Sequence, residues 1–512
     1  MVKITGITGA QFEADTPEYD TARIQYATFG GNHDDQGLDP LLIIKPKNKD
    51  DIKLALAYAN EQRIAVAIRT GGHQYSGASS TTSQNIQIDL SETFAGEWFS
   101  TEEIDGEHKR SLVRVSVSWR LNDFNAMLGA NGLFVPHGQC GHVMLGGHVQ
   151  TGGYGQLGRS FGLLSDHVRT LEIITHDGQE LEVDRTHFPE LFYAMLGGSP
   201  GNFGVLTHVT LEVHRDQDHQ GARAMKAGWL YDPAVMKRLT DMVVQMGEDD
   251  NFPANFDLCV SVIDHGADLP AHGFDNPALR DSNDLGPPMI VVYAQWVPLT
   301  PGEVFDERAQ QWFTELGQGA FQGNTIIEAP MSKITPMWIF PNPREYNLPY
   351  VKRAYVTNSK TLSKDGWAQW VTDRCTQIVG KHAEDLHLAV QLQCFGGGLS
   401  KFKINADNGT SLSWRRDSTI VAVLDCFHDE DSKVDAEQWQ NVNDEQGVGP
   451  KGIFSREDRR VLWGSYGEWD LDKVWNCYYE DREKYEKLGE IRKIYDPNGV
   501  FTSNPFSVKR AV

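Results

Sequence analysis

The stretch from Pro136 to Gly155 constrains the fold more than any other part of the chain. It reads PHGQCGHVMLGGHVQTGGYG, and so many glycines fit neither an ordinary helix nor an ordinary strand. Glycine lets backbone N–H groups approach a ligand closely, and consecutive N–H groups form a concave site for anions. We therefore expect loops that surround a bound phosphate or ring system.

Two further glycine-rich segments lie on either side of this stretch. Residues 69–77 read RTGGHQYSG, in which a strand runs into a glycine pair and one histidine. Residues 191–205 read LFYAMLGGSPGNFGV. A histidine beside two glycines is often an ordinary loop residue, so each segment alone is a modest signal. Together the three segments predict a ligand site built from residues 69 to 204.

The first 215 residues alternate between strand and helix patterns. Apolar residues at helical spacing predict helices over 49–62 and 121–132. Residues 168–183 predict a hairpin with Asp177-Gly178 at its turn. Short apolar or alternating runs predict strands over 40–46, 63–70, 85–90 and 111–119.

Beyond Arg215 the dense glycines disappear and the pattern changes. It predicts helices over 235–247 and 366–382 and strands over 288–298, 387–395 and 419–427, which favours an α+β domain with an antiparallel sheet. The residues from 466 onward return to a helical pattern. We therefore predict three parts, which span residues 1–215, 216–465 and 466–512.

Composition argues against several classes of protein. The 512 residues carry a formal net charge of -23 and no run rich in Lys or Arg, which disfavours nucleic acid as a partner. No stretch reaches the ~20 apolar residues that a membrane span needs. Residues 1–20 lack the apolar run of a secretory signal, so we expect an intracellular protein, or a secreted one whose export segment is absent from this sequence.

A zinc site is an alternative reading of the glycine-dense stretch. Histidine and cysteine bind zinc, and this stretch contains His137, Cys140, His142 and His148. Their spacing matches no familiar zinc motif, and zinc would leave the glycines unexplained. The six cysteines of the chain also include no CxxC pair. We therefore expect no metal.

The motifs and their order resemble those of one family. GGH-x-Y-x-G, G-x-C-x-x-V, GGH-x-x-x-GGYG, R-x-x-GL-x-x-D, GNFGV and YDPNGVF follow one another along the chain. This set is similar to that of the berberine bridge enzyme-like oxidoreductases, which belong to the vanillyl-alcohol oxidase superfamily. The resemblance implies an α+β fold with a PCMH-type FAD-binding domain of two α/β subdomains. A substrate domain, whose antiparallel sheet is covered by helices, and a C-terminal segment returning to the FAD domain would follow.

The resemblance implies FAD held by two covalent bonds. His73 matches the histidine that bonds the flavin 8α-methyl group, and Cys140 matches the cysteine that bonds flavin C6. His148 matches a histidine near the ribityl chain, and Val143 lies where family oxidases carry a small β-branched residue that admits O2. The other cofactor-binding residues that the resemblance implies are Arg69, Thr70, Gly71, Gly72, Gln74, Gly146, Gly147, Gly152, Gly153, Tyr154, Gly155, Gly204 and Val205. Met144, Gln150-Thr151 and Ser199-Pro200 depart from the family pattern, but they remove neither covalent anchor.

The resemblance also implies catalytic residues. Tyr75 matches an active-site tyrosine of the sugar-oxidising branch. Tyr466, in WGSYGEWD, matches the catalytic base, and Trp463 takes the place of another tyrosine; a core or surface tyrosine is the alternative for Tyr466. Gln391 and Gln393 alternate along one strand and therefore share a face, where sugar-oxidising relatives carry Gln and Asp. Two glutamines on a solvated sheet face are the alternative.

The expected activity is that of an FAD-dependent oxidase with a bicovalent flavin. It would move a hydride from a substrate CH–OH group to flavin N5 and pass the electrons to O2, giving H2O2. A sugar, an oligosaccharide or another alcohol is the expected substrate. A secondary-metabolite oxidase that dehydrogenates or cyclises its substrate is the alternative, and a flavin-binding protein without turnover is a third reading. We expect a monomer whose partners are a small-molecule substrate and O2.

Overall fold

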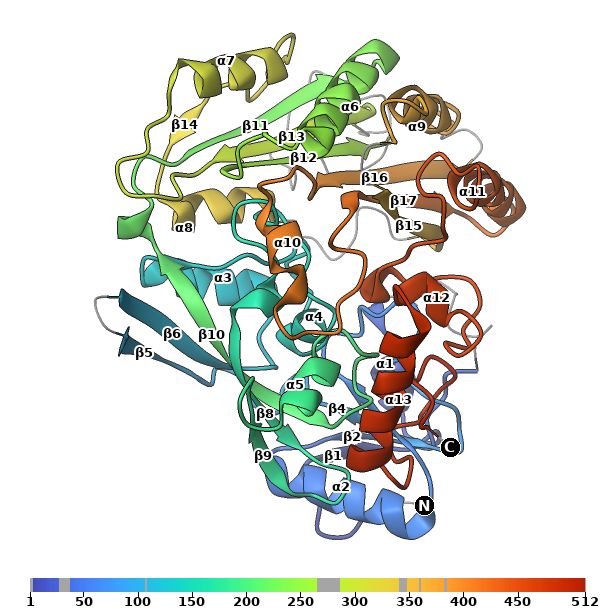
Figure 1. The fold of residues 1–512 in the computed structure, drawn as a ribbon. Helices are drawn as coiled ribbons and strands as arrows, with labels where there is room; N and C mark the ends of the chain where they lie inside the picture. Colours follow the sequence, from blue (N-terminus) through green and yellow to red (C-terminus); the bar gives the residue numbers. More distant parts are fainter. Residues whose placement is uncertain are drawn as a thin grey trace.

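The part of the chain that the structure describes forms three β-sheets. The computed structural model describes residues 3–26, 37–105, 108–264, 286–339, 348–358, 361–381 and 385–511. Figure 1 shows the two N-terminal sheets in the lower half of the molecule and the third sheet above them.

The first sheet has the strand order β1-β2-β4-β3, in which β2, β4 and β3 are parallel. Its strands are Ala10–Phe12 (β1), Leu42–Lys45 (β2), Val66–Arg69 (β3) and Ile86–Asp89 (β4). Helix α2, Lys49–Gln62, follows β2 as predicted and begins at Asn48, whose side chain accepts a hydrogen bond from the Asp51 N–H. Because β3 ends directly before Gly71 and Gly72, this sheet positions the first glycine-rich loop.

The second sheet has the order β5-β6-β10-β8-β9, and the short strand β7 also pairs with β10. The hairpin predicted over 168–183 is confirmed, and Gly178 at its turn has a φ of +85°, which glycine adopts without strain. The strands are Trp98–Asp105 (β5), His108–Ser116 (β6), Leu133–Phe134 (β7), Val168–Ile174 (β8), Glu180–Val183 (β9) and Val205–Arg215 (β10).

The glycine-dense stretch contains a short helix that the sequence pattern did not predict. Helix α4, Leu145–Gln150, includes two adjacent glycines. A Cβ at Gly146 would lie 2.7 Å from the methyl carbon of Thr70, so only glycine lets α4 pack this closely against the first glycine-rich loop. The other helices of this region are Tyr19–Arg23 (α1), Leu121–Ala130 (α3) and Pro189–Met195 (α5).

The third sheet is antiparallel and has the order β14-β11-β13-β12-β16-β17-β15. One face packs against helices α6, α9 and α11 in a shared hydrophobic core, and α7 joins this layer (Figure 1). The strands are Arg223–Leu230 (β11), Phe256–Ile263 (β12), Met289–Trp296 (β13), Ile327–Glu328 (β14), Tyr350–Asn358 (β15), Leu386–Cys394 (β16) and Ser418–His428 (β17). The helices are Pro233–Glu248 (α6), Glu307–Leu316 (α7), Trp367–Thr376 (α9) and Lys433–Gly447 (α11).

Helix α9 is shorter than predicted. The sequence pattern extended it to residue 382, but the helix ends at Thr376 and gives way to turns. Gly380 has a φ of +84°, a left-handed conformation that does not continue a right-handed helix.

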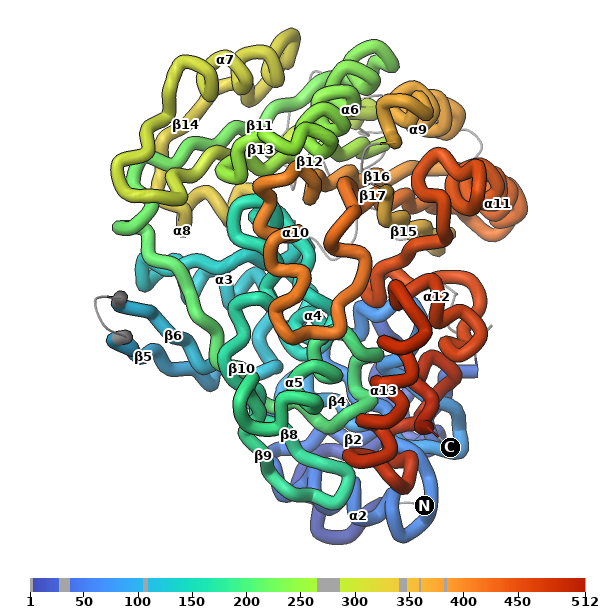
Figure 2. The backbone as a smooth tube through the Cα atoms, viewed as in Figure 1, coloured from blue at the N-terminus to red at the C-terminus, as the bar shows by residue number. Residues whose placement is uncertain are grey.

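The C-terminal segment returns to the N-terminal sheets. It carries helices α12, Trp475–Tyr478, and α13, Arg482–Tyr495. Figure 2 shows α13 beside α5, and its buried residues Leu488 and Ile491 share one hydrophobic core with β2 and β4. The predicted α+β fold class is confirmed. Among the described helices, none combines the length and the apolar character that a bilayer crossing requires.

Candidate active site

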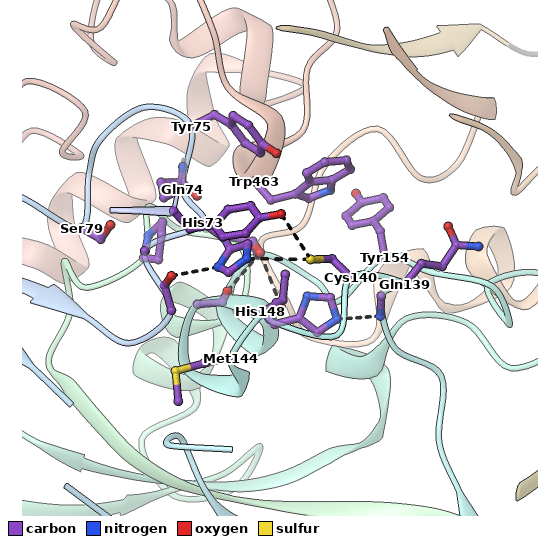
Figure 3. A pocket seen from close by; sticks show the side chains of 18 of the residues that line it. His73, Gln74, Tyr75, Ser79, Gln139, Cys140, Met144, His148, Tyr154 and Trp463 are labelled. Carbon is purple, nitrogen blue, oxygen red and sulfur yellow. Dashed lines mark hydrogen bonds between the residues drawn. The ribbon is translucent and has the colours of Figure 1, made fainter. Parts of the chain in front are cut away.

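A pocket lies between the glycine-rich loops and the third sheet. Figure 3 shows His73, Cys140 and His148 directed into the same space, with Tyr75 and Trp463 above them in this view. The third sheet contributes Ser261 from β12, Lys352 from β15, Gln391 and Gln393 from β16, and Asp425 from β17. The predicted site residues that line the pocket are Thr70, Gly71, Gly72, His73, Gln74, Tyr75, Cys140, Val143, Gly146, Gly147, His148, Tyr154, Gln391 and Gln393.

The two predicted covalent anchors meet in this pocket. His73 Nε2 lies 3.9 Å from Cys140 Sγ. The other ring nitrogen, Nδ1, lies 2.9 Å from the carbonyl oxygen of Gly71. Because a carbonyl oxygen only accepts hydrogen bonds, Nδ1 donates in this contact. Nε2 faces the cysteine sulfur.

Tyr26 contacts both anchors and was missed by the sequence analysis. Its ring stacks on the His73 imidazole, with ring centroids 3.7 Å apart and an angle of 18° between the planes. The Cys140 thiol donates a hydrogen bond to the Tyr26 hydroxyl at 3.8 Å. Tyr26 belongs to none of the glycine-rich motifs, and no local pattern marks a residue that reaches a site formed by distant loops.

The buried histidines of the glycine-dense stretch act as neutral hydrogen-bonding groups. Burial lowers the pKa of His148 to about 3, and its Nε2 accepts a hydrogen bond from the Gly138 N–H at 2.9 Å. Burial also lowers the pKa of His137 to about 4, and its ring nitrogens contact the Gly138 carbonyl and the Asn125 side chain. Among the described residues, no group of three or more His, Cys, Asp or Glu side chains is arranged to hold a metal ion.

The pocket walls fit a flat, polar cofactor such as FAD. A Cβ at Gly147 would meet no atom within 4 Å, so the backbone of α4 borders open space. Gly72 and Gly201 also line the cavity. Their φ angles are +66° and +77°, a left-handed conformation that favours glycine. Gln139 Nε2 is buried and has no hydrogen-bond partner among the described residues. Its amide nitrogen is therefore a buried polar group of the pocket wall that the described residues leave unsatisfied.

The part of the pocket that the third sheet forms carries an ion pair beside an aromatic ring. Lys352 Nζ donates to both carboxylate oxygens of Asp425, at 2.7 Å each. These residues are paired across β15 and β17, so both side chains point to the same face. The Lys352 ammonium also lies 4.3 Å from the centroid of the Tyr75 ring. A cation thus lies beside a predicted catalytic phenol.

Gln391 and Gln393 lie on the face that the alternation predicted. Gln391 donates a hydrogen bond to the side-chain oxygen of Gln139, the residue directly before Cys140. This bond connects the cysteine loop to the third sheet. Ser261 on β12 is the cross-strand neighbour of Gln391 and lines the same pocket.

Tyr466, the predicted catalytic base, lies away from the other predicted site residues. Tyr466 does not line the pocket but lies in the core between the third sheet and its helices, where it is 7% exposed. Burial, partly opposed by the charge of Arg460, raises the pKa of Tyr466 well above its ordinary value. Its hydroxyl has no hydrogen-bond partner within the described residues. Trp463, three residues earlier, is the side chain of this segment that reaches the pocket.

Several predicted cofactor-binding residues instead support the loops. Arg69 is buried and paired with Asp89 at 2.6 Å. A Cβ at Gly155 would lie 1.8 Å from the His137 carbonyl oxygen, so this glycine permits two loop segments to touch. The predicted cofactor-binding residues that do not line the pocket are Arg69, Gly152, Gly153, Gly155, Gly204 and Val205.

Lys352 and Asp425 are the charged pocket residues that the sequence analysis missed. Asp425 interrupts the apolar run of a predicted strand, TIVAVLDCF, and Lys352 lies in a strand that was not predicted. A single charge inside an otherwise apolar strand is a usable signal, because such a charge must be paired or functional.

Comparisons with known proteins identify an FAD binding domain in this chain. Residues 40–184 match the family model of an FAD binding domain. The chain is 31% identical to the FAD-linked oxidoreductase YvdP of Bacillus subtilis over 176 residues, which are 34% of this chain and 38% of that protein. It is also 31% identical to berberine bridge enzyme-like 12 of Arabidopsis thaliana over 178 residues, 33% of this chain and 31% of that protein. The matches thus span less than half the length of these curated relatives.

Solved structures share the fold over almost the whole chain. BBE-like 1 of Physcomitrella patens has a TM-score of 0.73 at 16% identity, covering 99% of this chain and 98% of that chain. The glucooligosaccharide oxidase of Acremonium strictum, which is described with a 6-S-cysteinyl, 8α-N1-histidyl FAD, has a TM-score of 0.70 at 15% identity, covering 98% of each chain.

The chain therefore carries an FAD binding domain, and its relatives include proteins named FAD-linked oxidoreductases. Its fold is the one that berberine bridge enzyme-like proteins and oligosaccharide oxidases share. The resemblance and the PCMH-type fold predicted from the sequence are confirmed.

Proposed function

We propose that this protein is an FAD-linked oxidase that holds FAD by two covalent bonds, through His73 and Cys140. It oxidises a CH–OH group of a small uncharged substrate and uses O2 as the electron acceptor. The observation that carries this proposal is the 3.9 Å approach of His73 Nε2 to Cys140 Sγ at the pocket. Two nucleophilic side chains that are 67 residues apart in sequence converge where one ligand can reach both.

The residues around the anchors have separate tasks in holding the cofactor. The glycine backbones of the loops leave room for it, and the neutral His148, which lines the pocket, supplies a polar ring. FAD supplies the hydride acceptor once it is bound. The protein's part of the reaction is to orient the substrate and to move one proton.

The charges of the pocket favour a neutral, hydroxylated substrate. Among the described pocket residues, Lys352 and Asp425 are the ones with a formal charge at neutral pH, and they neutralise each other. An anionic or cationic substrate would have to break this pair. Ammonium, carboxylate, amide and hydroxyl groups together suit the hydroxyls of a sugar, an oligosaccharide or another alcohol.

Tyr75 is the group that takes the proton of the substrate hydroxyl in this proposal. The Lys352 ammonium, 4.3 Å from the Tyr75 ring centroid, favours the phenolate form that a base must have. Asp425 holds Lys352 in place through two hydrogen bonds. The substrate proton therefore moves to Tyr75, a side chain of the N-terminal region. Lys352, a cation of the third sheet, positions this tyrosine.

Acid precipitation of the purified protein tests the covalent attachment. The wild type and the single variants His73→Ala and Cys140→Ala should give yellow pellets, because each single variant keeps one bond. The double variant should give a colourless pellet and release its flavin. A colourless pellet from the wild type would contradict the proposal.

A panel of sugars and simple alcohols with peroxide detection tests the reaction. Release of H2O2 with a member of the panel supports the proposed substrate class. A flavin that is bleached only by larger natural-product alcohols would point to secondary metabolism, and a flavin that no substrate bleaches would point to a binding protein.

A further inference from the structure

The N-terminal segment brings an aromatic ring to the two flavin anchors. Tyr26 stacks on His73 at 3.7 Å, and its hydroxyl accepts a hydrogen bond from the Cys140 thiol at 3.8 Å. One side chain thus contacts both groups that would bond the flavin, and it also lines the pocket.

The backbone that carries Tyr26 is fixed by a buried guanidinium. Arg69 is paired with Asp89 at 2.6 Å and donates to the carbonyl oxygens of Ala22 at 2.6 Å and of Ile24 at 3.2 Å. Since Arg69 is the last residue of β3, the end of this strand holds the segment that presents the tyrosine.

The loop that carries His73 is shaped to receive this segment. Gly72 has a φ of +66°, and a Cβ there would lie 3.3 Å from the backbone nitrogen of Tyr26. The loop and the segment therefore pack closely just before His73. The stacked ring limits rotation of the imidazole, whose Nδ1 is held by the Gly71 carbonyl oxygen.

We propose that Tyr26 is a positioning residue for both flavin bonds. Its ring holds the His73 imidazole in the plane that directs Nε2 toward Cys140, and its hydroxyl holds the cysteine sulfur. This inference rests on the proposed covalent attachment. Each new bond replaces one hydrogen of the imidazole or thiol and one hydrogen of the flavin. These two hydrogens, with their two electrons, pass to O2 and give H2O2.

The test measures flavin attachment rather than turnover. The wild type, Tyr26→Leu and Tyr26→Phe are purified and precipitated with acid, and FAD is quantified in pellet and supernatant. Mass spectrometry then identifies the modified peptides that contain residues 73 and 140. In Tyr26→Leu both covalent fractions, each taken relative to the total bound FAD, should fall by on the order of tenfold, because misplaced nucleophiles react slowly. Tyr26→Phe keeps the ring, so it should retain the bond to His73 and lower only the bond to Cys140.

Tyr19 offers a matched control in the same segment. Its hydroxyl donates to the Pro40 carbonyl at 2.6 Å and does not line the pocket. Tyr19→Phe therefore weakens the anchoring of the segment without touching either anchor, and it should attach flavin normally. An equal loss in Tyr19→Phe would show that Tyr26 acts only through the folding of the segment, which overturns the inference.

The remaining outcomes separate this inference from the proposed function. Normal attachment in Tyr26→Leu overturns the inference and leaves the proposed function standing. A wild type without covalent flavin overturns the proposed function, and the inference with it.

Discussion

At the residue scale, the two tyrosines predicted as catalytic have opposite surroundings. Tyr75 lines the pocket, and the Lys352 ammonium lies 4.3 Å from the centroid of its ring. Tyr466 lies in the hydrophobic core on the helical side of the third sheet, and its hydroxyl is buried. A tyrosine acts as a base only in its phenolate form, and a nearby cation stabilises that form. The surroundings of Tyr75 therefore favour it over Tyr466 as the base.

Substitution of each tyrosine by phenylalanine tests this assignment. We expect Tyr466→Phe to keep kcat within about a factor of two, because its hydroxyl takes part in no proton transfer. Its free energy of unfolding should stay equal or rise by about 1 kcal/mol, since a buried hydroxyl without a partner is removed. Tyr75→Phe should lower kcat by ~10²–10⁴ with unchanged covalent flavin. Steady-state kinetics measure kcat, and denaturant unfolding measures the free energy of unfolding. A larger loss of kcat in Tyr466→Phe than in Tyr75→Phe would assign the base to Tyr466.

The sequence identified the pocket residues of the N-terminal loops better than those of the third sheet. His73 and Cys140 lie inside glycine-rich motifs whose local spacing identifies them. Lys352, Asp425 and Tyr26 become site residues only through contacts with distant parts of the chain. Such contacts depend on strand order and packing, which residue spacing does not encode.

At the element scale, a buried ion pair joins the 3-10 helix η3, Leu164–His167, to the loop of residues 410–417. Both Arg415 terminal nitrogens donate to the Asp166 carboxylate at 2.7 Å, and the two side chains are 0% and 4% exposed. Burial by itself would raise the pKa of Asp166, but the charge and hydrogen bonds of Arg415 lower it below its ordinary value. Asp166, the aspartate of the R-x-x-GL-x-x-D motif, therefore connects the FAD-binding region to the chain between β16 and β17.

Removing one partner of this pair should be costly. We expect Arg415→Met to lower the free energy of unfolding by ~3–5 kcal/mol, because it leaves the Asp166 charge buried and unpaired. The double variant Asp166→Asn/Arg415→Met should lose less than the sum of the single losses, since neither charge remains. Denaturant unfolding followed by tryptophan fluorescence gives both values. A single variant as stable as the wild type would show that water replaces the missing partner.

Periodicity predicted most elements near the site and failed where glycine decides the backbone. The predicted helix over 49–62 and the predicted hairpin over 168–183 are present, because their apolar spacing and turn residues act locally. Helix α4 was missed because two of its residues are glycines, which helix propensity disfavours. Close packing against Thr70 outweighs that propensity.

At the scale of the whole molecule, buried histidines make stability depend on pH. Burial lowers the pKa of His137 to about 4 and of His148 to about 3, and it lowers the pKa of His214 well below the ordinary value. The unfolded chain binds protons on these rings below about pH 6.5, whereas the folded chain does not. The stability that these neutral, buried histidines give the folded state is therefore complete above pH 6.5. It is lost as the pH falls toward 3–4.

A substitution at His214 isolates this effect. We expect the wild type to unfold at lower denaturant concentration at pH 5 than at pH 7. His214→Phe should reduce that difference, because the ring packs against Phe134 and Phe161 and the variant has no imidazole to protonate. Denaturant unfolding at the two pH values gives the comparison, and an identical pH dependence in both proteins would contradict it.

The arrangement of the sheets separates two tasks within one pocket. The side chains predicted to bond the cofactor come from loops of the N-terminal region, whereas Lys352, Gln391 and Asp425 come from the third sheet. A duplicated gene could therefore acquire a new specificity through a few point mutations on three adjacent strands, with its redox centre already complete.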